Sequence, residues 1–136
     1  MFVNLSNHPS GTWSITQRDA ALELSAGGPI VDLPFPHVDP AAPAATVVAD
    51  ARECAQLVLA HFSQESLHNG TAVAMIQGEP TFVFALLLIL IPTGVRCFAA
   101  TTDRIVTATR DEGDVVRKTS EFRFIQFREY TPGSPF

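Results

Sequence analysis

The stretch from Thr71 to Ile91 places an almost wholly apolar strand directly before an almost wholly apolar helix. The run "TAVAMIQ" (71–77) has apolar residues at both alternating sets of positions, so a strand made from it is buried on both faces. The run "FVFALLLILI" (82–91) is half the length of the roughly 20 residues needed to span a bilayer. We therefore expect an inner strand, a buried helix beside it, and no membrane partner.

Shorter strands and helices alternate around this pair. Strands are predicted at 1–6, 29–33 and 95–101, and helices at 15–26, where Ser14 and Gln17 form a capping box, and at 44–64. Strands that alternate with helices over short connections are typical of a parallel sheet covered on both faces. The predicted fold is therefore α/β, with a Rossmann-like parallel sheet flanked by helices.

The last part of the chain has a different pattern. The segments "RIVTATR" (104–110) and "KTSEFRFIQFREY" (118–130) are joined by the turn-forming "DEGD", which predicts a C-terminal antiparallel β-hairpin. Its second strand is rich in aromatic residues, which fit either the core or a subunit interface. We expect a single domain over residues 1–130 and a short tail over 131–136.

Charge and cysteine content exclude several classes of protein. The formal net charge of −5 disfavours a general nucleic-acid binder, so no DNA partner is expected. The two cysteines, Cys54 and Cys97, make neither a disulfide framework nor a metal-ligand spacing, and we expect free, buried thiols. No secretory signal pattern opens the chain, which predicts a cytoplasmic location. No metal and no cofactor are expected.

Polar residues follow three of the predicted parallel strands. Open parallel sheets bind ligands beyond the carboxyl ends of their strands, where the strand order reverses. The residues at these places are Asn7, His8, Ser10, Thr12 and Trp13 after the first strand, Gln77, Gly78, Glu79 and Thr81 after the third, and Thr101, Thr102, Asp103 and Arg104 after the fourth. The convergence of three polar loops on one edge predicts a ligand site there.

Structural roles compete with ligand binding at several of these positions. Ser14 and Thr81 fit helix caps better than ligand contacts. Ser10 and Thr12 fit turn residues equally well, and a lone histidine such as His8 is more often a structural hydrogen-bonding group. Trp13 fits either a lid over the site or the core.

Gly78 and Arg104 each leave two roles open. Gly78 allows either a close approach of ligand to backbone or a tight start to the helix. Arg104 offers a fork of donors to a phosphate in a chain poor in positive charge. Its alternative role is an ion pair with Asp103, Glu112 or Glu121.

Three segments together resemble a known group of proteins. The segments "MFVNLSNHPSGTWSITQRDAA", "QGEPTFVFALL" and "FAATTDRIV…FRFIQFREY" are similar to small CRISPR-accessory proteins with a CRISPR-associated Rossmann fold, found with type III systems. The resemblance covers most of the chain. It rests on overall layout and loop placement, not on a diagnostic catalytic signature.

The resemblance implies a homodimer that binds a cyclic oligoadenylate over the carboxyl ends of the parallel strands. The group includes ring nucleases, in which a ribose 2′-hydroxyl attacks the neighbouring phosphate without a metal, and plain binders of the ring. In the nuclease version Arg104 would stabilise phosphate charge, and His8 would protonate the leaving 5′-oxygen or orient the phosphate. Asn7, Ser10, Trp13, Gln77, Gly78, Glu79, Thr81, Thr101 and Thr102 would contact the ring. The loops contain no lysine, which weakens the case for catalysis more than that for binding.

Two other classes of function stay open at this stage. One is a small Rossmann-like enzyme that acts on a nucleotide or nucleoside, with Glu79 as acid, base or nucleophile. The other is a non-catalytic interaction protein whose contact surface is the Phe-rich last strand. Loss of turnover in Glu79→Gln would favour the first, and loss of assembly on substitution of Phe122 or Phe124 would favour the second.

Overall fold

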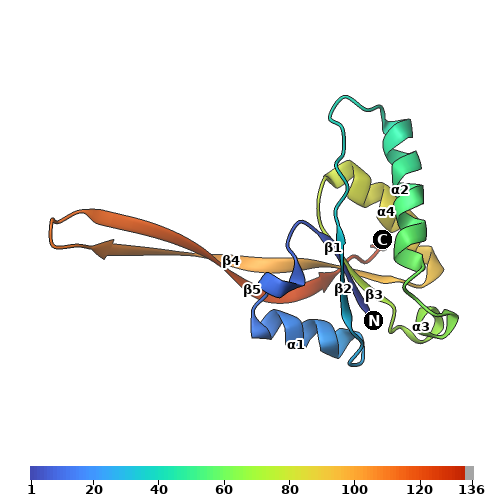
Figure 1. Ribbon diagram of the computed structural model, residues 1–136, viewed down its shortest axis with the longest axis horizontal. Helices are drawn as coiled ribbons and strands as arrows, with labels where there is room; N and C mark the ends of the chain where they lie inside the picture. Colours follow the sequence, from blue (N-terminus) through green and yellow to red (C-terminus); the bar gives the residue numbers. More distant parts are fainter. Residues whose placement is uncertain (134–136) are drawn as a thin grey trace.

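A single five-stranded sheet in the order β2-β1-β3-β4-β5 forms the centre of the computed structural model, which describes residues 1–133 (Figure 1). The strands are β1 (Phe2–Ser6), β2 (Ile30–Pro34), β3 (Val73–Ile76), β4 (Arg96–Arg110) and β5 (Val116–Glu129). β1 to β4 pair in parallel, and β5 pairs with β4 in antiparallel orientation. The predicted α/β fold with a C-terminal antiparallel hairpin is confirmed. Part of the predicted tail, residues 134–136, lies outside the described residues.

Helices cover both faces of the parallel part of the sheet, and each face has its own core. α1 (Ile15–Leu24) lies on one face, where Phe2, Met75 and Phe98 pack with Trp13 and Ala21. α2 (Ala44–Leu59) and α4 (Pro80–Leu90) lie on the other face with Val3, Leu5 and Ile76. β1 and β3 therefore contribute alternate side chains to the two cores, as the apolar run at 71–77 predicts.

The predicted helix over 44–64 is interrupted. α2 ends at Leu59, and a separate helix, α3 (Gln64–Asn69), follows. The Ser63 side chain accepts a hydrogen bond from Ser66 N–H and so caps the second helix. Gly70 ends α3 with a φ of 80°, a left-handed conformation that suits glycine.

α4 is only partly buried, which corrects the prediction of a fully buried helix. Phe82, Leu86 and Leu90 lie in the core, but the side chains of Phe84 and Leu88 are 64% and 62% exposed. One proline and one glycine end this helix. The short 3-10 turn η2 (Ile91–Thr93) includes Pro92, and Gly94 follows it with a φ of 103°. The chain then enters β4.

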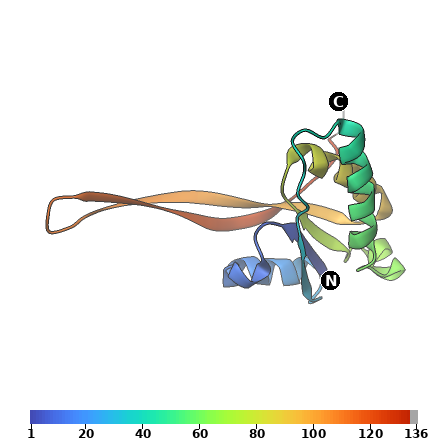
Figure 2. The same cartoon turned by 45° about the horizontal axis from the view of Figure 1, so that its top comes forward.

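The largest departure from the sequence prediction lies in β4. A strand over 95–101, a loop and a second strand from 104 are predicted, whereas the structure has one strand from Arg96 to Arg110. The run "TTDRIVTAT" (101–109) is rich in β-branched residues and sustains the strand, because it pairs with β5 along its length, with one register shift between Thr101 and Thr102. The distal halves of β4 and β5 leave the body as a long two-stranded ribbon (Figures 1 and 2). We call residues 102–124 the arm.

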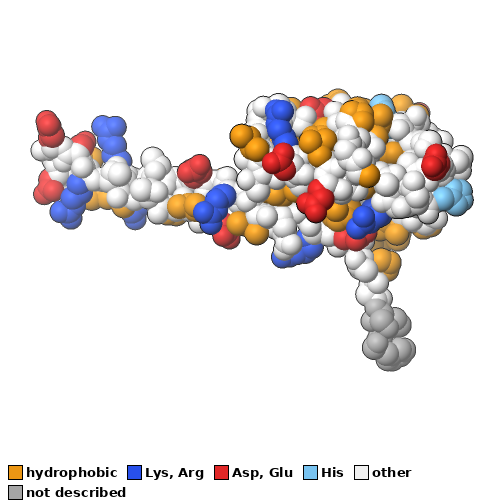
Figure 3. Space-filling view, turned by 90° about the horizontal axis from the view of Figure 1, so that it is seen from below, with side chains coloured by type: hydrophobic (Ala, Val, Ile, Leu, Met, Phe, Trp, Pro, Cys, Tyr) orange, Lys and Arg blue, Asp and Glu red, His pale blue; other side chains and the backbone are white. Residues whose placement is uncertain are grey.

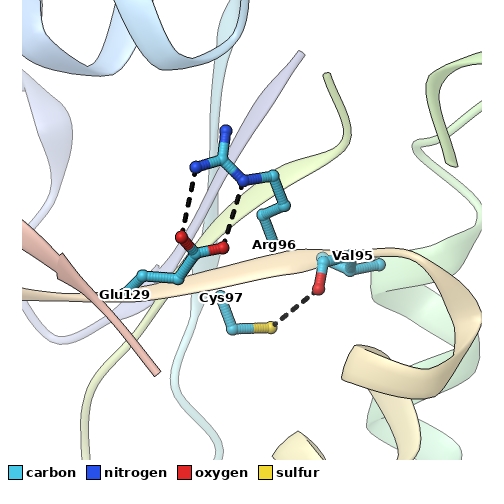
Figure 4. A network of polar contacts seen from close by, with 4 residues as sticks. All are labelled: Val95, Arg96, Cys97 and Glu129. Atoms are coloured by element: carbon cyan, nitrogen blue, oxygen red, sulfur yellow. Dashed lines mark hydrogen bonds and ion pairs between the residues drawn. The ribbon is translucent and has the colours of Figure 1, made fainter. Parts of the chain in front are cut away.

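An ion pair joins the ends of β4 and β5 that lie in the body, at Arg96 and Glu129. Arg96 forms a bidentate ion pair with Glu129, with Nε 3.1 Å from Oε1 and Nη2 3.2 Å from Oε2 (Figure 4). Cys97, next to Arg96 in β4, has its side chain on the other side of the strand, where it is buried and its Sγ contacts the Val95 carbonyl. Burial, with a smaller effect from the Glu129 carboxylate, raises the pKa of Cys97 to about 12. Both cysteines are free and buried, as predicted.

Candidate functional site

The strand order reverses next to β1. From β1 the chain passes to β2 on one side, and it later returns to β3 on the other side. Ligands of open α/β sheets bind beyond the carboxyl ends of the strands at such a point. The loops after β1 and β3 meet here: Gln77 N–H donates to the Leu5 carbonyl at 3.2 Å.

A hollow of about 510 Å³ opens on the α1 side of this edge. Its walls come from the β1–α1 loop, the first turn of α1, the end of β3 and the base of the arm. Aromatic rings and polar side chains with both donor and acceptor atoms dominate the lining. The lining residues are His8, Thr12, Trp13, Gln17, Met75, Gln77, Ala100, Thr102 and Phe122.

A buried polar network holds the β1–α1 loop against the sheet. Asn4, 1% exposed, donates from Nδ2 to the His8 carbonyl and to Asp32 Oδ1, both at 2.8 Å, and its Oδ1 accepts from the Ser6 hydroxyl. The Asp32 carboxylate also accepts from the N–H and the hydroxyl of Ser10. The network therefore fixes where the loop crosses the strand ends.

The network also sets the charge of Asp32. Burial alone would raise the pKa of this carboxyl, but the hydrogen bonds from Asn4 and Ser10 outweigh burial and lower the pKa below its ordinary value. Asp32 is therefore ionised at neutral pH. Ser10, a predicted ligand contact, has its hydroxyl engaged by Asp32.

Trp13 belongs to the core and at the same time forms part of the wall of the hollow. Its side chain is 7% exposed, with ring centroids 5.9 Å from both Phe2 and Phe127. Its Nε1 donates to the His8 carbonyl at 3.1 Å. The structure thus places Trp13 in the core instead of as a mobile lid, with one edge turned to the hollow.

Gln77 extends the pairing of β3 and β4 beyond the last backbone ladder. Its Oε1 accepts from Ala100 N–H at 3.0 Å, and its Nε2 lies 3.5 Å from the Ala100 carbonyl. The side chain therefore replaces a backbone partner at the point where β3 ends. Its amide forms one wall of the hollow.

Asn7, Gly78, Glu79 and Thr81 do not line the hollow. Asn7 and Glu79 face a separate depression on the α2 and α4 side, beside Phe35 and His37. A side chain at Gly78 would overlap the Phe35 ring, so glycine is required by packing here. The predicted site therefore divides between the two faces of the sheet.

Glu79, not Thr81, caps α4. Its Oε2 accepts from Phe82 N–H at 2.8 Å and from the Thr81 hydroxyl at 2.6 Å. The hydrogen bonds from Thr81 and Phe82 lower the pKa of Glu79. The prediction of Thr81 as the cap is wrong, because a carboxylate one residue before Pro80 reaches the same free N–H groups.

Arg104 lies in the arm and not in a loop. Its Nε and Nη2 donate to the Ser120 hydroxyl at 3.3 and 3.0 Å, so its alternative role as an ion-pair partner of Asp103, Glu112 or Glu121 is not observed. Arg104 stands directly opposite Phe122, which lines the hollow. It lies on the same face of the ribbon as Thr102, which places it at the opening of the hollow, referred to below as the mouth.

Thr101 does not face the hollow, because its hydroxyl donates to the Gln126 carbonyl.

Several residues of the site are not among the sequence candidates. Asn4 and Asp32 are polar residues at paired positions inside two apolar strands, and this is the signal that could have revealed them. Phe122 and Gln17 carry no such signal, because their approach to the hollow depends on the arm pairing and on the start of α1. Within residues 1–133, no group of three or more His, Cys, Asp or Glu side chains is placed to hold a metal ion.

Removal of the Glu79 carboxylate tests whether this residue is a cap or a chemical group. We expect Glu79→Gln to lower the urea midpoint of unfolding, because the ionised cap of α4 is lost, and to leave ligand binding in the hollow unchanged. Thr81→Val, which removes only the hydroxyl partner, should have a smaller effect. Loss of a catalytic activity in Glu79→Gln with unchanged unfolding would instead identify Glu79 as a reacting group.

The chain matches the Uncharacterized protein MJ1673 family over residues 1–128 and therefore belongs to that family. No curated protein and no solved structure matches the chain. Within the described part, no helix is long and apolar enough to cross a membrane.

Proposed function

We propose that this member of the MJ1673 family binds a cyclic oligoadenylate second messenger in the hollow on the α1 side of the sheet, as a cytoplasmic homodimer. The observation that carries the proposal is the composition of the hollow at the strand-order reversal. Phe122 offers an exposed aromatic surface for an adenine, Trp13 adds one ring edge, and Gln77, Gln17 and Thr102 offer donors and acceptors for the edge of the base. The resemblance to CRISPR-accessory proteins supplies the identity of the ligand.

Ring cleavage is the catalytic version of this proposal. A ribose 2′-hydroxyl would release its proton to solvent water and its oxygen would form a bond to the adjacent phosphorus, while the bond from phosphorus to the 5′-oxygen breaks, which leaves a cyclic phosphate end. His8, which lines the hollow, would donate a proton to the leaving 5′-oxygen or orient the phosphate. Arg104 at the mouth would exchange its Ser120 hydroxyl for a phosphate oxygen. Positioning of the 2′-hydroxyl in line would supply much of the acceleration.

Binding and product analysis with cyclic tri-, tetra- and hexa-adenylate tests the proposal. We expect at least one ring to bind in calorimetry, and chromatography with mass detection to show whether it is opened. Binding with the ring intact supports a sensor and rejects the nuclease. The absence of binding to all three rings rejects the proposal.

Two substitutions on one strand locate the binding site. Thr102→Trp fills the hollow and should weaken binding about tenfold or more. Thr107→Trp places the same side chain on the other face of the arm, away from the hollow, and should change binding less than about twofold. Equal losses in both variants would place the ligand elsewhere.

A further inference from the structure

The arm lacks a covering partner within the described chain. Apart from the paired strands themselves, no element packs on its distal half (Figures 1 and 2). Val106, Val116 and Phe122 are 55%, 49% and 69% exposed. An isolated two-stranded ribbon is marginally stable in water, and exposed apolar side chains on it indicate a contact surface.

One face of the arm is basic and apolar. The pairing of β4 with β5 puts alternate residues on a common face that continues from the hollow. We call this the basic face; it consists of Arg104, Val106, Ala108, Arg110, Val116, Lys118, Ser120 and Phe122. It carries three cations and no acidic residue, although Arg110 is 3.5 Å from Asp114 in the turn. The opposite face carries Asp103 and Glu121 as well as Arg117 and Arg123. Figure 3 shows the arm as a narrow projection with charged and hydrophobic side chains along it.

The body has the complementary charge. Residues 1–101 contain eight Asp and Glu but only three Lys and Arg. On the hollow side of the sheet, α1 presents Asp19 and Glu23 to solvent and has Ile15, 78% exposed, in its first turn. A second copy of this chain therefore offers acidic and apolar groups that match the basic face.

The hollow is poor in cations for a ligand with several phosphates. Its lining includes His8 and no Lys or Arg, and Arg104 lies at its mouth. Five of the nine basic residues of the chain are on the arm. The molecule thus contains the cations that a polyanion requires. Apart from Arg104, however, those on the arm lie far from the hollow of the same chain.

Two-fold symmetry would bring these cations to a hollow. A two-fold axis through the middle of the arm places the tip of each arm at the base of the other, where the partner's hollow opens. Ala108 lies six positions beyond Thr102 on β4, about 20 Å along the strand, and pairs with Lys118 on β5, so the basic face spans the required distance. When two such faces oppose each other, Val106 and Ala108 lie near the axis.

We propose that the arms of two copies exchange, and that the tip of each arm brings Arg110 and Lys118 to the mouth of the partner's hollow. The anionic part of this inference rests on the proposed function, whereas the exchange itself does not. Arg104 of one copy and the incoming cations of the other would form one positive cluster, which the acidic residues of α1 offset in part and an anion bound in the hollow would neutralise further. A ring with several phosphates should therefore tighten the dimer.

Cross-linking tests the exchange without any ligand. A tagged Thr12→Cys chain is mixed with a Glu112→Cys chain and treated with a short bismaleimide; the native cysteines are buried. We expect an intermolecular product, and none when Gln56→Cys on α2 replaces Thr12→Cys. A monomer by light scattering, or the same product with Gln56→Cys, overturns the exchange whether or not a ring binds.

A pair of charge reversals tests the contribution to the partner's site. Lys118→Glu should weaken ring binding about tenfold, and Arg117→Glu, one residue away on the opposite face, should have little effect. Equal affinity in both variants overturns the role of Lys118.

A cross-linked dimer that binds no ring supports the exchange and rejects the proposed function. A monomer whose arm instead binds oligonucleotides would reject the exchange.

Discussion

Replacing Trp13 with alanine should lower the free energy of unfolding by about 3–5 kcal/mol, the range for deletion of a large buried aromatic side chain. Trp13 fills the space between α1 and the sheet against Phe2 and Phe127. The substitution would leave a cavity there that neighbouring side chains fill only in part. Because Trp13 is the only tryptophan, urea unfolding is followed by circular dichroism instead of fluorescence.

Two controls separate packing from hydrogen bonding. Trp13→Phe keeps an aromatic ring but loses the Nε1 donor, and should cost about 1 kcal/mol for the hydrogen bond plus a smaller packing loss. The His8 carbonyl keeps its second donor, Asn4 Nδ2, in both variants. Ile15→Ala, at an exposed site nearby, should change stability by less than about 0.5 kcal/mol. A cost below about 1 kcal/mol for Trp13→Ala would mean that Trp13 is a lid instead of a core residue.

The parallel part of the fold could be predicted because strands that are buried on both faces consist of continuous apolar residues. The run at 71–77 can only be an inner strand, and its two-sided burial requires helices on both faces. The arm could not be predicted in the same way. Residues 102–104 are polar enough for a loop. They become part of a strand only because β4 pairs with β5, which lies later in the sequence, along the arm of 23 residues.

The sequence located the edge of the sheet that carries the site but not which face each residue serves. Asn7 and His8 are neighbours in sequence, yet they line depressions on opposite sides. The face on which a side chain lies after a strand ends depends on the conformation of the turn that follows. Here the hydrogen bonds of Asn4 and Asp32 fix that turn. For Ser10 the sequence left a ligand contact and a structural role open, and the hydroxyl forms a structural hydrogen bond with Asp32. For Glu79 the sequence did not reveal the structural role, because the carboxylate caps α4.

The second large effect is expected for Asn4→Asp, which differs from the native side chain by an oxygen in place of an NH₂ group. It would put a second carboxylate at hydrogen-bond distance from Asp32 and remove the shortest of the hydrogen bonds to the His8 carbonyl. Desolvation of a buried carboxylate and repulsion between the two charges should lower stability at pH 7 by about 3 kcal/mol. The β1–α1 loop would lose its anchor, so ligand binding in the hollow should weaken as well.

The pH dependence identifies the cause. In the native protein the lowered pKa of Asp32 contributes stability above its ordinary pKa, and this contribution is lost as the pH falls through the folded-state value. In Asn4→Asp the carboxylate pair shares one proton more readily, so one folded-state pKa is raised. The deficit relative to the native protein should therefore shrink as the pH is lowered from 7 to about 4. A deficit that does not depend on pH would indicate lost hydrogen bonds alone.

Exchange of the two side chains provides the matched control. In the double variant Asn4→Asp with Asp32→Asn, one carboxylate and one amide are again opposed across β1 and β2, so the repulsion disappears. The carboxylate introduced at position 4 would still accept from the Ser6 hydroxyl, and the amide introduced at position 32 could accept from Ser10 N–H through its oxygen. The His8 carbonyl would lose its donor from position 4, because a carboxylate cannot donate, and would keep the Trp13 Nε1 donor and the longer contact to the Ser6 hydroxyl. The double variant should thus recover most, but not all, of the stability, and failure to recover more than the Asn4→Asp single variant would show that charge repulsion is not the main cost.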